Sequence, residues 1–103
     1  MSAHVADHHE AVLQKRAHVP EHVVHRQFAE ETVVLNLKTG HYHGLNPTGG
    51  RMMDVLGESP TVGVAAQRLA EEYDQPVAVI EQDLSAFCLT LVERDLLELL
   101  DPA

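Results

Sequence analysis

The chain has 103 residues, a hydrophobic content of 45% and a formal net charge of −9, which together predict one folded domain with a modest core. No apolar run approaches the roughly 20 residues of a membrane-spanning helix, and the N-terminal residues include no apolar segment of the kind found in secretion signals. Cys88 is the single cysteine, so an internal disulfide is excluded and we expect a protein of the reducing cytoplasm.

The negative charge is confined to the second half of the chain. Residues 1–51 contain five Lys or Arg and five Asp or Glu, whereas residues 52–103 contain two Lys or Arg and eleven Asp or Glu. An acidic surface repels a phosphate backbone, so nucleic-acid binding is disfavoured. The same surface would keep the protein soluble or attract a basic partner.

The first half of the chain predicts an arm and a small sheet. Residues 1–17 are polar and rich in histidine, which is typical of a flexible arm ahead of a single domain over residues 18–103. Alternating residues with high strand propensity then predict three strands, at residues 23–28, 32–37 and 41–45. Gly40 stands where the second hairpin loop needs a positive φ, and the short connections predict an antiparallel meander.

Three helices are predicted after the strands. They cover residues 47–56 (or 48–56), 61–73 and 77–94, where apolar residues recur at helical spacing. Asn46 or Thr48 supplies the capping oxygen of the first helix. Leucines at residues 96–100 form an apolar tail, in helix or extended, that can close over the core. The order βββααα is an α+β arrangement of the winged helix-turn-helix type.

The sequence contains no catalytic constellation. It has no Gly-x-Ser-x-Gly elbow, no phosphate-binding loop and no dinucleotide fingerprint. Cys88 falls in the middle of the third helix, near its apolar face, and the charges around it are acidic or distant. A reactive thiol needs an electropositive, accessible site, so Cys88 is interpreted as a packed core residue. We therefore expect a protein that is not an enzyme and needs no cofactor.

Metal binding and DNA binding remain as alternative functions. Histidines on the predicted sheet could share one metal ion, although no Cys or carboxylate ligand accompanies them at a defined spacing. These histidines are His22, His25, His41 and His43. A winged-helix DNA-binding regulator is the second alternative, but the third helix offers Arg94 as its only cation.

Peptide binding is the remaining function. The strand at residues 41–45 leads directly into the first helix, so it could be a free sheet edge beside a helix. An extended peptide can add to such an edge through main-chain hydrogen bonds. From the residues alone, peptide binding at this edge and a hairpin edge that stays solvated are equally favoured.

Three motifs resemble one known family. The first consists of Leu37, Gly40, Tyr42, Leu45, Asn46, Thr48 and Gly49, and the others lie in residues 61–73 and 83–97. In this order they resemble the PqqD-like proteins, the recognition elements of ribosomally synthesised and post-translationally modified peptides (RiPPs). The resemblance covers about residues 19–100. Residues 43–50 are similar to discrete members from lasso-peptide pathways.

The resemblance implies a non-catalytic protein that binds the leader region of a precursor peptide. The leader would pair with the third strand, pack beside the third helix, and be delivered to a modifying enzyme or leader protease, as in lasso-peptide or pyrroloquinoline quinone biosynthesis. A monomer, a weak homodimer or a domain-swapped homodimer is expected. Asp95 stands where the family often has glycine, and Asp tolerates the left-handed conformation that the helix end needs.

The predicted contacts to the leader fall on two elements. Those on the strand are His41, Tyr42, His43, Gly44 and Leu45, and those on the helix are Ile80, Asp83, Leu84, Phe87 and Leu91. The helical apolar residues are also the best candidates for packing against the sheet, so groove and core remain alternatives for them.

Overall fold

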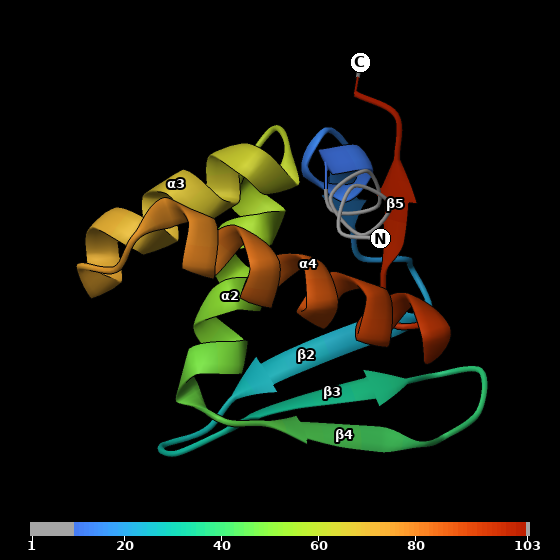
Figure 1. Ribbon diagram of the computed structural model, residues 1–103. Helices are drawn as coiled ribbons and strands as arrows, with labels where there is room; N and C mark the ends of the chain where they lie inside the picture. Colours follow the sequence, from blue (N-terminus) through green and yellow to red (C-terminus); the bar gives the residue numbers. More distant parts are fainter. Residues whose placement is uncertain (1–9, 103) are drawn as a thin grey trace.

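The computed structural model describes residues 10–102. A three-stranded antiparallel sheet lies on one side of the molecule and three helices lie on the other, packed against the inner face of the sheet and against one another (Figure 1). The strands are β2 (Val23–Gln27), β3 (Thr32–Asn36) and β4 (Tyr42–Leu45), with β3 in the centre. This arrangement confirms the predicted α+β class and the βββααα order.

The helices begin and end where the sequence signals predicted, within about two residues. They are α2 (Pro47–Glu58), α3 (Val62–Tyr73) and α4 (Val77–Glu93). Asn46 and Thr61 cap the first two, because each side-chain oxygen accepts the backbone N–H three residues further on. In the described part of the chain, none of these helices has the length and apolar character that crossing a bilayer requires.

The central strand shows the alternation expected of a sheet with one covered face. Thr32, Val34 and Asn36 are buried on the helix side, while Val33 and Leu35 are half-buried on the outer side. Asn36 also fixes the β3–β4 turn, since its Oδ1 accepts from two backbone N–H groups of that turn. The turn ends at Gly40 with φ 76°, as predicted.

The two ends of the described chain pair with each other, which the sequence did not predict. Strand β1 (Arg16–His18) is antiparallel to β5 (Glu98–Leu100), and Lys15 forms an ion pair with Asp101. Residues 10–13 are helical, and Val12 is buried in the core. The described part of the expected arm, residues 10–17, is therefore packed structure. The rest of that arm, residues 1–9, lies outside the described residues.

The C-terminal tail is extended, and the chain changes direction into it at Asp95, directly after α4 ends. Asp95 has φ 57°, the left-handed conformation expected at this position. Its carboxylate lies 3.1 Å from Nε2 of His22, which ties the turn to the start of the sheet. Leu96 and Leu97 then enter the core, and β5 follows.

The core is a single cluster in which α4 contributes one apolar stripe. Ile80, Leu84, Cys88 and Leu91 are each less than 8% exposed. They step at i, i+4, i+8 and i+11 and so occupy one face of the helix. Burial of this face fixes the rotation of α4 against the rest of the domain.

We predict that Leu84→Ala lowers the free energy of unfolding by about 2–5 kcal/mol, because it leaves a cavity in the core. Leu84 is fully buried, whereas Leu89 on the same helix is 44% exposed. The matched control Leu89→Ala should cost less than about 1 kcal/mol. Urea denaturation followed by circular dichroism measures both. Equal losses for the two variants would contradict this assignment of the helix faces.

Candidate functional site

Strand β4 leaves one edge of its backbone open. Within residues 10–102, β3 is the only strand that pairs with it. The carbonyl of His41 accepts the N–H of Asn36 at 2.9 Å, so His41 and every second residue after it turn their polar backbone groups toward β3. The N–H and C=O groups of Tyr42 and Gly44 therefore point away from the sheet, toward the open edge.

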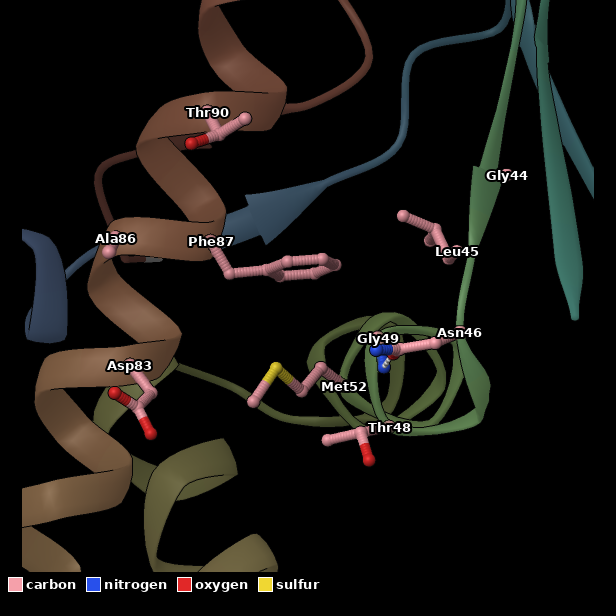
Figure 2. A pocket seen from close by; sticks show the side chains of 10 residues that line it. All are labelled: Gly44, Leu45, Asn46, Thr48, Gly49, Met52, Asp83, Ala86, Phe87 and Thr90. Carbon is pink, nitrogen blue, oxygen red and sulfur yellow. Dashed lines mark hydrogen bonds between the residues drawn. The ribbon is translucent and has the colours of Figure 1, made fainter.

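A groove lies beside this edge, between β4, the start of α2 and one face of α4 (Figure 2). Its volume is about 510 Å³. Gly44, Leu45, Asn46, Thr48, Gly49 and Met52 line one side, and Asp83, Ala86, Phe87 and Thr90 line the other. In Figure 2 the ring of Phe87 projects from α4 across the groove toward Leu45, above Met52.

The groove has distinct ends. Asp83 lies at the end formed by the first turn of α2, and Thr90 lies at the end nearer Gly44 (Figure 2). A second hollow of about 260 Å³ continues past Asp83. Thr48, Met52 and Asp83 line both hollows, and Ile80 lines the second.

Two glycines allow α2 to form the floor of the groove. A Cβ added to Gly50 would lie 2.3 Å from Oγ1 of Thr32, which is too close for any other residue without displacement of α2 or β3. A Cβ added to Gly49 would lie 3.3 Å from the Cβ of Leu45 and 3.6 Å from the ring of Phe87. The sequence Asn46-Pro47-Thr48-Gly49-Gly50 thus combines a cap, a helix start and a close helix–sheet contact.

Several predicted contact residues do come together at the groove. Gly44, Leu45, Asp83 and Phe87 line it, and the backbone of Tyr42 borders the same open edge. Ile80 is 7% exposed and reaches only the second hollow.

Other predicted contact residues lie elsewhere. Leu84 and Leu91 are 0% and 2% exposed, so they belong to the core, as the packing alternative had it, and offer no surface to a peptide. The backbone of His41 points toward β3, and its N–H donates to Oγ1 of Thr39 in the turn. The side chain of His43 is half-buried, and its Nδ1 lies 3.3 Å from Nη1 of Arg94.

Six residues that line the groove were not predicted from the sequence; four belong to the start of α2 or its cap and two to α4. The residues missed are Asn46, Thr48, Gly49, Met52, Ala86 and Thr90. A signal for the α4 stripe existed, because Asp83, Phe87 and Thr90 repeat at i, i+4 and i+7 directly beside the apolar core stripe.

Residues 31–97 match the family described as coenzyme PQQ synthesis protein D (PqqD). The chain belongs to the PqqD family. This confirms the resemblance inferred from the three motifs. The matched range includes β3, β4 and all three helices, and therefore the whole groove.

Two solved structures resemble this PqqD-family chain along most of their length. One is described as TbiB1 in complex with the TbiA(beta) leader peptide; it is 31% identical, with a TM-score of 0.72, and the match covers 78% of this chain and 93% of that one. The other is a lasso peptide synthetase B1 complexed with the leader peptide; it is 25% identical, with a TM-score of 0.71, and the match covers 81% of this chain and 98% of that one. No curated protein matches the chain.

The described histidines of this PqqD-family protein form no cluster that could share a metal ion. Among residues 10–102, no group of three or more His, Cys, Asp or Glu side chains is placed to hold a metal ion. His22 contacts Asp95, and His43 contacts Arg94. The alternative of a shared metal on these histidines therefore has no corresponding arrangement in the described residues.

Cys88 lies in the core of α4, as expected. Its side chain is 0% exposed, and burial raises the pKa of the thiol from 9.0 to about 12. Burial disfavours the charged thiolate, which is the nucleophilic form. Cys88 thus has neither the access nor the ionisation that a catalytic thiol needs.

We predict that this thiol makes unfolding easier at alkaline pH. Between pH 9 and about 12 the thiol ionises in the unfolded chain but stays protonated in the folded one, so the free energy of unfolding falls as pH rises through that window. Urea denaturation at several pH values, compared with Cys88→Ala, isolates the contribution because other titrating groups are common to both proteins. A parallel decline in the two proteins would contradict the assignment.

Proposed function

We propose that this chain binds the leader region of a ribosomally synthesised precursor peptide and delivers it to a modifying enzyme or leader protease of a RiPP pathway, most closely a lasso-peptide pathway. The observation that carries the proposal is the open edge of β4 beside the groove of α4. The two similar solved structures support it, since both are described as complexes with a leader peptide.

In this proposal the leader adds to β4 as a fourth strand. The outward N–H and C=O groups of Tyr42 and Gly44 supply its main-chain hydrogen bonds. Side chains of a strand alternate between its two faces, so every second leader side chain would enter the groove. Leu45, Met52 and Phe87 form the apolar surface that these side chains meet.

Both interactions are needed for useful affinity. A main-chain hydrogen bond contributes about 0.5–1.5 kcal/mol, and full burial of one large apolar side chain contributes about 1.5–3 kcal/mol. Ordering each leader residue costs about 1–2 kcal/mol of backbone entropy. Pairing alone would therefore barely offset the ordering cost, and the anchors that enter the groove decide the net affinity.

The proposed role does not include catalysis. Cys88 is buried and protonated at neutral pH, and the groove residues are Asp83, Thr48, Thr90 and apolar or amide side chains. Chemistry on the precursor would then belong to the partner enzyme. The protein would act in the cytoplasm, where precursor peptides are made on ribosomes and where a free thiol such as that of Cys88 stays reduced.

Isothermal titration calorimetry tests the proposal. The titrant is a synthetic peptide with the leader sequence of the precursor encoded beside the gene for this chain. We expect saturable 1:1 binding, with no heat from a peptide of the same composition in scrambled order. Absence of binding at high micromolar protein would contradict the proposal.

We predict that Tyr42→Pro weakens leader binding by about tenfold relative to Tyr42→Ala. Both variants lose the exposed ring, which is 73% exposed, but only proline removes the outward N–H of Tyr42. Proline is tolerated at the first residue of an edge strand, so the fold should persist, which circular dichroism verifies. Equal affinities for the two variants would argue against pairing at this position.

A further inference from the structure

One stripe of α4 carries opposite charges at its two ends. Asp83, Phe87, Thr90 and Arg94 repeat at i, i+4, i+7 and i+11, so they share one face of the helix and its C-cap. The first three line the groove. Arg94 is the next position on the same stripe, beyond Thr90.

Arg94 is held at the Gly44 end of the groove. Its Nη1 donates to Nδ1 of His43 at 3.3 Å, and His43 directly precedes Gly44 on β4. A guanidinium cannot accept a hydrogen bond, so His43 is the acceptor and its proton lies on Nε2. This contact uses one of five donors and leaves the others available.

The charge of Arg94 is not neutralised by the described part of the chain. Among residues 10–102, none of the ion pairs includes Arg94. The adjacent carboxylate of Asp95 is 3.1 Å from Nε2 of His22 instead. An exposed guanidinium without a carboxylate partner is suited to bidentate recognition of one.

Asp83 carries a negative charge, unpaired within the described chain, at the opposite end of the groove. Its side chain is exposed, and no cation of the described residues forms an ion pair with it. Arg94 lies eleven positions further along the chain, a rise of about 16 Å at 1.5 Å per residue. An extended peptide covers that distance in about five residues.

We propose that Arg94 binds a carboxylate side chain of the bound peptide while Asp83 binds a basic one, so that the groove orients its peptide by charge. This inference rests on the leader-binding function proposed above and names the class of leader it takes. Side chains on one face of a strand recur at even spacing, so the two charged residues are four or six positions apart. An antiparallel peptide reaches the Asp83 end first, and its basic residue precedes its acidic one.

The experiment measures binding of the same synthetic leader peptide by calorimetry to Arg94→Gln. We expect about fivefold weaker binding at low salt, the size of a good exposed ion pair, and a smaller difference near 0.5 M NaCl. Arg26→Gln is the matched control, because Arg26 is an exposed residue on β2 and lies outside the groove. It removes the same charge and should leave the affinity unchanged.

Charge reversal tests which peptide residue is the partner. Arg94→Glu should weaken binding further, and a leader with its acidic residue changed to Arg should restore it. The inference is overturned if Arg94→Gln binds like the unmodified protein while Tyr42→Pro still weakens binding; the proposed function then stands. If the unmodified protein binds no leader at all, both the inference and the proposed function fail.

Discussion

The rotation of α4 about its own axis is the constraint on which the rest of the structure depends. Ile80, Leu84, Cys88 and Leu91 are buried together, and their burial leaves the helix one orientation against the sheet and α3. At about 100° per residue, the positions just before this stripe turn toward β4. Asp83 and Phe87 therefore face the groove because Leu84 and Cys88 face the core. The core thus determines the chemistry of the surface beside it.

A second constraint acts through the first turn of α2. The close contact between Gly50 and Thr32 brings this turn against the central strand, directly after β4 ends. Strand β4 can then be only four residues long, and α2 closes the groove at its Leu45 end. Met53 faces the core at 2% exposure, while its neighbour Met52 forms part of the groove. One helix turn therefore serves both as packing and as a binding surface.

Local signals in the sequence were sufficient to predict where β2 to β4 and α2 to α4 begin and end. Hydrophobic periodicity located the three strands and three helices, and residues with special backbone preferences marked their ends. Gly40 and Asp95 both adopt the positive φ expected of them. These features depend on neighbours in sequence, so a single chain contains enough information to find them.

Two features, the pairing of the chain ends and the division of α4 into core and groove, could not be predicted from local signals. The pairing of β1 with β5 joins residues at least 80 positions apart, and strands of three residues carry almost no pattern of their own. The sequence also left open whether Leu84 and Leu91 belong to the core or to the groove, and the structure buries both. An apolar stripe predicts that a helix packs, but a shift of one residue decides which side chains are covered, and that shift depends on tertiary contacts.

Affinity and selectivity for a peptide come from different groups of the site, the backbone of β4 and the side chains of the groove. Hydrogen bonds to the backbone of Tyr42 and Gly44 are the same for any extended peptide, so they cannot distinguish one sequence from another. Discrimination must come from the side chains of the groove, where Phe87, Met52 and Leu45 favour apolar anchors. Net charge adds a further filter, because a chain of −9 repels acidic peptides over distances comparable to the Debye length. Against that background, the exposed guanidinium of Arg94 at one end of the groove would attract a carboxylate of the peptide that the rest of the acidic surface repels, and so add to selectivity.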